Sequence, residues 1–250
     1  MSRFDSHGVA IAYETLGVGR PIVLIHGFAS TRTINWKNPR WFDTLAEVGR
    51  QVIALDCRGH GQSDKPHDPA AYHPDHMAGD VIRMMDVLGI ERADLMGYSM
   101  GGRIAAGLLA RHPERFESVV LAGIGSRGVT SPRPGAEATA RALEVADPNA
   151  IVEPSGRAFR EFAEHYRNDL HALAACMRGF ATAAVDAADL QRTRVPVLIV
   201  VGEKDELVGD PQPLAALIPT ARVVMIPGRD HLSTVGDRRY KEAVVDFLRN

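Results

Sequence analysis

Short apolar runs, each bounded by turn residues, recur along the chain and predict the strands of a sheet. Six of these runs are apolar throughout and rich in β-branched residues, which is typical of strands buried on both faces; they span residues 22–25, 52–55, 94–98, 118–122, 196–201 and 222–226. Near the start, residues 3–6, a His7-Gly8 turn and alternating apolar residues over 9–13 predict a hairpin.

Helical patterns lie between most of these runs. Apolar residues spaced three and four positions apart predict helices over 75–88 and 240–248, and an Ala- and Leu-rich stretch predicts another over 103–111. Alternation of strand and helix indicates a mostly parallel sheet with helices on both faces.

One long segment, residues 126–190, contains no strand pattern. A turn-rich stretch over 126–135 precedes short helical patterns around 137–145, 155–166 and 170–180. Because such an insertion between two strands of a parallel sheet should lie over the carboxyl edge, we expect a small helical cap or lid. Residues 1–125 and 191–250 would then form a single α/β core domain.

Composition and charge narrow the class of partner. The chain has 250 residues, 45% of them hydrophobic and 24% charged, with a net charge of −2, which is ordinary for a soluble globular protein. The chain has no excess of basic residues that would favour a nucleic-acid partner. No apolar run approaches the length of a membrane span, about 18 residues. We expect a cytoplasmic protein, because the N-terminus shows no signal-peptide pattern and the distant Cys57 and Cys176 are best explained as buried thiols, with a lone disulfide as the alternative.

The strongest chemical signal is Gly97-Tyr98-Ser99-Met100-Gly101, which matches G-x-S-x-G between a predicted strand and a predicted helix. The tight turn needs glycine on either side and presents the Ser99 hydroxyl at the sheet edge, where the positive helix N-terminus suits a developing anion. Ser99 is therefore the candidate nucleophile. The alternative is a helix N-cap in a structural turn, which would be favoured if no base and acid followed at other strand ends.

Both partners follow in the order Ser, Asp, His that this motif requires. Asp205 comes just after the strand at 196–201, and His231 just after the strand at 222–226. Parallel strands end on one side, so we expect His231 to accept the Ser99 proton and Asp205 to orient the imidazole. Glu203 and Asp230 are nearby rivals for the role of the acid.

A second loop at this edge offers an oxyanion hole. His26-Gly27-Phe28 follows the strand at 22–25, and we expect the backbone N–H groups of Phe28 and Met100 to bind the tetrahedral oxyanion. The His26 ring is expected to hold the loop rather than to act in catalysis.

Together these motifs resemble the α/β-hydrolase-fold enzymes over nearly the full chain. The resemblance includes Asp56 to Ser63, which is similar to the structural D-x-R-G-x-G-x-S loop of that family. It implies an eight-stranded sheet, a cap after the sixth strand, and hydrolysis through an acyl-enzyme without cofactor or metal. The single His-Gly, with no HGGG-type loop, is closer to the small bacterial esterase and lactonase branch.

The substrate is less defined. Gly97 to Arg103 is also similar to the menaquinone-pathway lyase that releases pyruvate, in which an arginine at this point helps to hold a carboxylate; Arg103 could instead be a buried scaffold residue. Arg127, Arg157 and Arg160 are candidates to complete such a site. Apolar residues of the predicted cap, Phe159, Phe162 and Met177, could line an acyl pocket or simply hold the cap to the core.

Two weaker motifs fail their structural context. Gly123 to Gly128 fits G-x-G-x-x-G, but prolines follow where a dinucleotide-binding helix must begin. His73 and His76 lack the accompanying ligands of a zinc site. The sequence therefore favours a serine carboxylic ester hydrolase acting on small to medium acyl esters. The alternatives are the pyruvate-releasing lyase, a carbon–carbon or enol-lactone hydrolase, and a non-catalytic scaffold.

Overall fold

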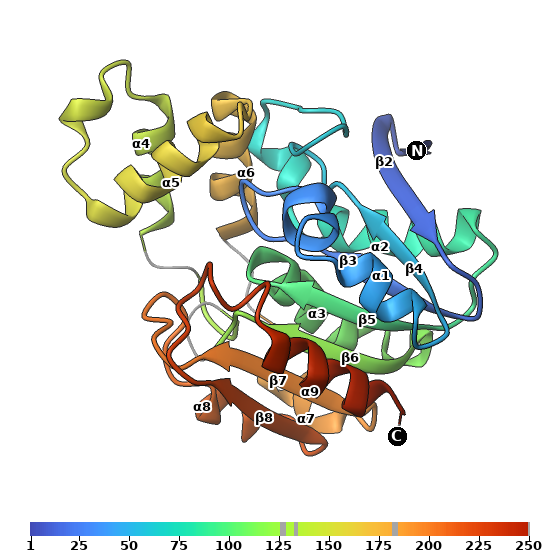
Figure 1. Ribbon diagram of the computed structural model, residues 1–250. Helices are drawn as coiled ribbons and strands as arrows, with labels where there is room; N and C mark the ends of the chain where they lie inside the picture. Colours follow the sequence, from blue (N-terminus) through green and yellow to red (C-terminus); the bar gives the residue numbers. More distant parts are fainter. Residues whose placement is uncertain (126–128, 133–134, 182–184, 250) are drawn as a thin grey trace.

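The protein is built on one eight-stranded sheet with the strand order β1-β2-β4-β3-β5-β6-β7-β8 (Figure 1). The computed structural model describes residues 1–125, 129–132, 135–181 and 185–249. The β1–β2 and β2–β4 pairs are antiparallel and the other pairs are parallel, which confirms the predicted mostly parallel sheet. The strands are β1 (Ser2–Ser6), β2 (Val9–Leu16), β3 (Arg20–Ile25), β4 (Arg50–Leu55), β5 (Ala93–Tyr98), β6 (Phe116–Ala122), β7 (Val197–Gly202) and β8 (Ala221–Ile226).

The predicted N-terminal hairpin is confirmed. Ser6 pairs with Val9, and the two residues between them, His7 and Gly8, have φ angles of 54° and 84°. Two consecutive left-handed residues match the right-handed twist of the flanking strands, which explains the glycine at the second position.

Helices cover both faces of the sheet. On one face lie α1 (Trp41–Ala46) and α9 (Arg238–Arg249), and on the other lie α2 (Pro74–Val87), α3 (Met100–Arg111) and α7 (Ala187–Arg192). Another short helix, α8 (Gln212–Ala215), packs against β8. The apolar pattern missed α1, α7 and α8, because helices of 6, 6 and 4 residues are too short to show a helical period.

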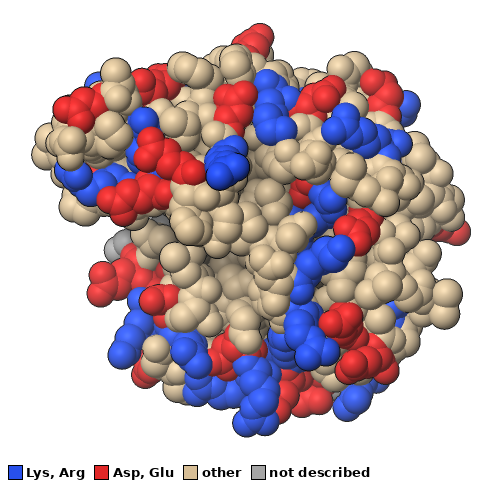
Figure 2. Space-filling view, turned by 45° about the horizontal axis from the view of Figure 1, so that its top comes forward, with Lys and Arg blue, Asp and Glu red and all other residues tan. Residues whose placement is uncertain are grey.

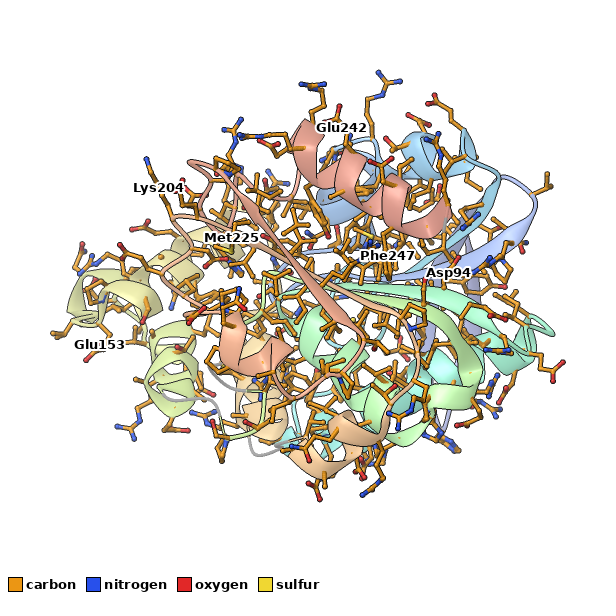
Figure 3. The ribbon with its side chains drawn as sticks, turned by 90° about the horizontal axis from the view of Figure 1, so that it is seen from below. Asp94, Glu153, Lys204, Met225, Glu242 and Phe247 are labelled. Carbon is orange, nitrogen blue, oxygen red and sulfur yellow. The ribbon has the colours of Figure 1, made fainter. Side chains whose placement is uncertain are left out.

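Alternate residues of each inner strand point into two separate hydrophobic cores, one on each face of the sheet. In β3, Ile22 and Leu24 pack with α1 and α9, whereas Val23 and Ile25 pack with α2 and α3. Figure 3 shows the same division on α9, where Phe247 is turned towards the sheet and Glu242 away from it. Burial on both faces explains why these strands read as continuous apolar runs.

The prediction of burial on both faces is wrong for β8. This strand lies at the edge of the sheet and pairs with β7 alone, and its Met225 is 42% exposed (Figure 3). A strand at the edge of a sheet pairs with one neighbouring strand instead of two, so more of its side chains stay exposed. The apolar run of β8 therefore reflects β-propensity more than burial.

Of the helices between β6 and β7, three α-helices lie beyond the carboxyl ends of the strands (Figure 1). These inserted helices are α4 (Ala136–Glu144), α5 (Pro154–His165) and α6 (Leu170–Ala181). The helix α6 packs closely on the short 3₁₀ helix η2 (Pro69–Tyr72), since a Cβ on Gly179 would lie 2.0 Å from the Pro69 carbonyl oxygen.

The helix α5 is joined to α4 by a buried arginine. The Nη1 atom of Arg160 donates to three carbonyls at the end of α4, those of Ala142, Leu143 and Val145. By contrast α7, which begins within the predicted cap range and ends just beyond it, packs on α3 of the core. Division of the chain at 126 and 190 stays a prediction.

Candidate active site

Ser99 lies in a strained turn between β5 and α3. Its φ and ψ angles are 55° and −112°, a backbone conformation that residues other than glycine rarely adopt. A Cβ on Gly97 would lie 2.1 Å from the Gly101 carbonyl oxygen, and a Cβ on Gly101 would lie 2.1 Å from the Ile25 carbonyl oxygen. Only glycine fits at both positions, so the pentapeptide forces the serine side chain outward at the sheet edge.

His231 and Asp205 lie beside this serine. The Ser99 hydroxyl donates to His231 Nε2 at 2.9 Å, and His231 Nδ1 donates to Asp205 Oδ2 at 2.6 Å. The Asp205 side chain is fully buried and that of His231 is 14% exposed. The loops after β7 and β8 are held together by a hydrogen bond of 2.8 Å from the Lys204 N–H to the Arg229 carbonyl. The structure thus brings together the three residues that the sequence selected.

The two rival carboxylates are engaged elsewhere. Glu203 accepts a hydrogen bond of 2.7 Å from the Gly228 N–H. Asp230 accepts from the N–H groups of Leu232 and Ser233, and these bonds, with that from the Ser233 hydroxyl, hold the pKa of Asp230 below its ordinary value. The geometry therefore favours Asp205 as the partner of the histidine.

Sequence reasoning missed one residue that positions the histidine. The hydroxyl of Tyr98 donates to the His231 carbonyl at 2.5 Å, and the two rings lie 5.4 Å apart. From the neighbouring α1, Trp41 Nε1 donates to the Val235 carbonyl at 2.8 Å. The signal available in the sequence was the position of Tyr98 directly before Ser99. When the serine side chain points outward from the turn, the side chain of the preceding residue must point the other way, towards the sheet.

The predicted oxyanion loop packs directly against Ser99. A Cβ on Gly27 would lie 3.4 Å from that of Ser99, and both Phe28 and Met100 line the cavity beside the hydroxyl. The His26 ring donates through Nδ1 to the Gly27 carbonyl at 2.7 Å and accepts through Nε2 from the Cys57 N–H at 2.9 Å. Both ring nitrogens are thus used in holding the loop.

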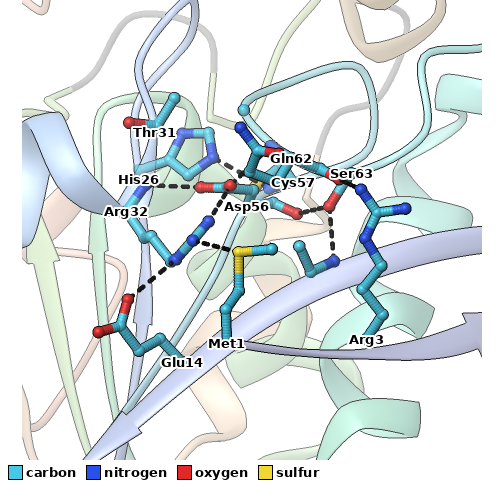
Figure 4. A network of polar contacts seen from close by, with 12 residues as sticks. Met1, Arg3, Glu14, His26, Thr31, Arg32, Asp56, Cys57, Gln62 and Ser63 are labelled. Carbon is cyan, nitrogen blue, oxygen red and sulfur yellow. Dashed lines mark hydrogen bonds and ion pairs between the residues drawn. The ribbon is translucent and has the colours of Figure 1, made fainter.

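A buried polar network supports this loop from below (Figure 4). Asp56 accepts from the backbone and the guanidinium of Arg32, on the oxyanion-loop side, and from the Gln62 N–H at 2.8 Å. The Ser63 hydroxyl donates to the Asp56 carbonyl at 2.6 Å and accepts from the Ala12 N–H. Through these hydrogen bonds the D-x-R-G-x-G-x-S segment joins the oxyanion loop to β2. None of these bonds involves Ser99.

Next to this network, His60 predicts a pH-dependent stability. Burial, and to a smaller extent the neighbouring His26, lower the pKa of His60 to about 3. The unfolded chain binds a proton near pH 6.5 and the folded chain does not, so stability falls as the pH drops from about 6.5 towards 3, by up to about 1.4 kcal/mol per pH unit. We expect His60→Asn to reduce this slope, with the remainder due to the equally buried His26, whose pKa is also lowered by burial, as measured by urea unfolding between pH 7 and pH 4.5.

The matched control is His7→Asn, which replaces an exposed histidine at a left-handed position that asparagine tolerates. This variant should keep the wild-type slope. Equal slopes for wild type and His60→Asn would contradict the assignment.

Two cavities meet at Ser99 and His231. The smaller, here called the arginine chamber, has a volume of about 230 Å³ and is lined by Met100, Arg103 and Met177 among others. The larger, here called the apolar chamber, has a volume of about 390 Å³ and is lined by Phe162 among others. Phe159 lines both, so the structure places all the predicted substrate contacts on these walls.

The arginine candidates among the described residues make contacts within the protein itself. Arg103 lies with its guanidinium over the Phe180 ring, 5.0 Å from the centroid. Arg157 donates to the Ile151 carbonyl and Arg160 to the end of α4, both within the inserted helices. Arg127 lies outside the described residues. Among the described residues, no His, Cys, Asp and Glu side chains gather in groups of three or more that could hold a metal ion, and none of the helices is long and apolar enough to cross a membrane.

A strained serine after the central strand, with a histidine and an aspartate from the next strand ends, is the arrangement of an α/β-hydrolase fold. The chain belongs to this family: the alpha/beta hydrolase fold model matches residues 20–178. The enol-lactonase of Burkholderia xenovorans LB400 superposes with a TM-score of 0.82 at 26% identity, and the match covers 100% of both chains.

Two curated relatives give different reactions. A 2-hydroxymuconate semialdehyde hydrolase of Pseudomonas sp. (strain CF600) is 40% identical over 125 residues, which are 50% of this chain and 43% of that protein. A Bacillus subtilis (strain 168) protein provisionally named 2-succinyl-6-hydroxy-2,4-cyclohexadiene-1-carboxylate synthase is 26% identical over 270 aligned positions, covering 98% of this chain and 96% of that protein. The first alignment thus spans less than half of the relative's length.

Proposed function

We propose that this chain is a serine hydrolase that cleaves carboxylic esters of small to medium acyl groups through an acyl-enzyme. The observation that carries the proposal is the continuous hydrogen-bonded line from Ser99 through His231 to the buried Asp205. This line gives the hydroxyl a base at 2.9 Å and gives the base a fixed tautomer.

Each step follows from this geometry. Ser99 Oγ attacks the ester carbonyl carbon while His231 Nε2 takes its proton, and the N–H groups of Phe28 and Met100 bind the oxyanion. The carbon–oxygen bond to the alcohol then breaks, and protonated His231 gives the proton to the leaving oxygen. Water, deprotonated by the same imidazole, attacks the acyl-enzyme and releases the acid and free Ser99.

The experiment is hydrolysis of p-nitrophenyl acetate and butyrate by the wild-type chain and by Ser99→Ala. Turnover by the wild type that is lost in the variant supports the proposal. A folded wild-type chain that turns over neither ester would overturn it.

A second candidate is a specialised reaction on a carboxylate-bearing substrate, by lyase or carbon–carbon or enol-lactone hydrolase chemistry. It is supported by Arg103 on the wall of the arginine chamber and by the reactions named for the relatives. The bonding of Arg157 and Arg160 within the inserted helices leaves Arg103 as the one cation among the described residues on the chamber walls.

The proposed oxyanion hole predicts a role for Asn168, which follows α5. Its Nδ2 donates at 2.9 Å to the carbonyl of Ala29, the left-handed residue next to Phe28. This bond joins the inserted helices to the loop that carries an oxyanion donor. We expect Asn168→Ala to lower kcat for p-nitrophenyl acetate about tenfold with little change in KM, since loss of a whole donor typically costs about 10²–10³.

The matched control is Asn149→Ala, which removes an asparagine of the inserted segment whose side-chain nitrogen bonds only locally, to Asp147. A drop in kcat confined to Asn168→Ala, at equal thermal stability, supports the role. Equal kcat values for the two variants would refute it.

A further inference from the structure

We propose that the apolar chamber binds an extended apolar chain of the ester, and that the far end of this chain lies against Leu207, Leu232 and Tyr166 at the chamber mouth. The inference rests on the proposed function and narrows its substrate class to esters of a small polar part and a longer apolar part. Neither the fold nor the hydrogen bonds at Ser99 requires this property.

The walls of the two chambers differ in charge. Among the described residues that line the apolar chamber there is no Lys, Arg, Asp or Glu, whereas the arginine chamber contains Arg103. The apolar chamber is also the larger, at about 390 Å³ against about 230 Å³. A chain without polar groups loses no hydrogen bonds to water when it enters such a cavity, and each methylene gains free energy from burial.

The mouth of the apolar chamber is itself apolar. Leu232, Leu207 and Tyr166 are 67%, 48% and 41% exposed, and all three line this chamber, with Leu207 lining the arginine chamber as well. They are three of the nine exposed large hydrophobic side chains in the described part of the chain. Figure 2 shows this face hollowed near its centre, with uncharged side chains around most of the hollow. Exposed apolar side chains that continue a catalytic cavity are best explained by a substrate that reaches them.

Two aromatic rings form part of the walls of both chambers. Phe28 and Phe159 meet edge to face, with ring centroids 5.6 Å apart, and both line both chambers beside Ser99. An ester whose carbonyl lies at Ser99 can therefore place its acyl part in one chamber and its alcohol part in the other. The long apolar part fits the chamber that opens onto the apolar mouth.

The experiment measures kcat/KM for two homologous series, p-nitrophenyl esters from acetate to decanoate and alkyl acetates from ethyl to decyl, all below their micelle concentrations. We expect kcat/KM to rise about two- to fourfold per methylene in one series, because each buried methylene contributes about 0.8 kcal/mol at most, a factor of about four. The series that rises identifies which part of the ester enters the apolar chamber. Flat or falling values beyond butyl in both series would overturn the inference.

Variants at the mouth test the location of the chain. Leu232→Ser and Tyr166→Ser, at residues that line the apolar chamber but not the arginine chamber, should each lower the ratio of long-chain to short-chain kcat/KM about fivefold. The matched control is Leu16→Ser, an exposed leucine at the end of β2 that does not line either chamber. Ratios equal to that of the control would overturn the proposed location.

The two levels of failure are distinguishable. Hydrolysis of acetates without any gain from longer chains would contradict the apolar-chain inference and leave the proposed function standing. Absence of turnover with every ester, by a chain that folds, would overturn both.

Discussion

Ser99→Ala is expected to lower kcat for p-nitrophenyl acetate by about 10⁵–10⁶, to the level that binding and the oxyanion donors provide alone. The variant lacks the oxygen that attacks the carbonyl, so no acyl-enzyme can form. The fold should persist, because Ser99 Oγ makes its hydrogen bond to His231, whose ring remains held by Asp205 and by Tyr98 through its carbonyl. Steady-state turnover and a thermal melt by circular dichroism measure the two effects separately.

A matched control for this variant is Ser155→Ala. Ser155 lines both chambers, yet no base is hydrogen-bonded to it among the described contacts as His231 is to Ser99. This variant should retain turnover within about tenfold. If Ser99→Ala kept wild-type activity, or if both variants lost it equally, another residue would have to be the nucleophile.

The elements that carry the reacting atoms were predictable because their signals are local. Gly97 and Gly101 mark the turn at Ser99 whatever the rest of the chain does, since the turn itself excludes a Cβ at both positions. Apolar runs indicate strands in the same way, although for the edge strand β8 the expected burial on both faces is wrong. Asp205 and His231 followed from strand ends and chain order, and the fold then brought them to 2.6 Å.

The contacts that tune this site were not predictable, because they join residues far apart in the sequence. The bond from Tyr98 to the His231 carbonyl spans 133 residues, and that from Asn168 to the Ala29 carbonyl spans 139. No local period encodes either of them. Short helices such as α1 were missed for a related reason: they are held by tertiary contacts, here the Trp41 and Tyr240 rings 4.7 Å apart.

The same limit applies to the substrate. Phe159 and Phe162 follow a helical pattern in the sequence, and that pattern does not say whether they face the core or a cavity. Packing of α5 against the oxyanion loop decides the matter, since Phe159 meets Phe28 at 5.6 Å and lines both chambers beside Ser99. We therefore expect specificity to depend on how the inserted helices dock, which the sequence pattern does not encode.

Asp205→Asn is expected to lower kcat by about 10⁴ while leaving the positions of Ser99 and His231 almost unchanged. The carboxylate accepts the Nδ1 proton of His231 at 2.6 Å and so keeps Nε2 free of a proton and able to accept one from Ser99. An amide can present its NH₂ group to Nδ1 instead, which favours the tautomer that cannot act as the base, and it cannot stabilise the imidazolium. The measurement is kcat for p-nitrophenyl acetate, with a thermal melt to show that the variant folds.

Asp230→Asn is the matched control, because Asp230 is next to His231 in the sequence and its carboxylate carries the same charge as that of Asp205. Its Oδ1 accepts from the N–H groups of Leu232 and Ser233, and an asparagine oxygen can accept the same bonds. The loop should keep its shape, and kcat should fall by less than about tenfold, the size of a lost nearby charge. A loss in Asp230→Asn as large as in Asp205→Asn would make Asp230 the acid partner. A small loss in both would mean that His231 keeps its tautomer without either carboxylate, so that the buried position of Asp205 would have to be explained by stability alone.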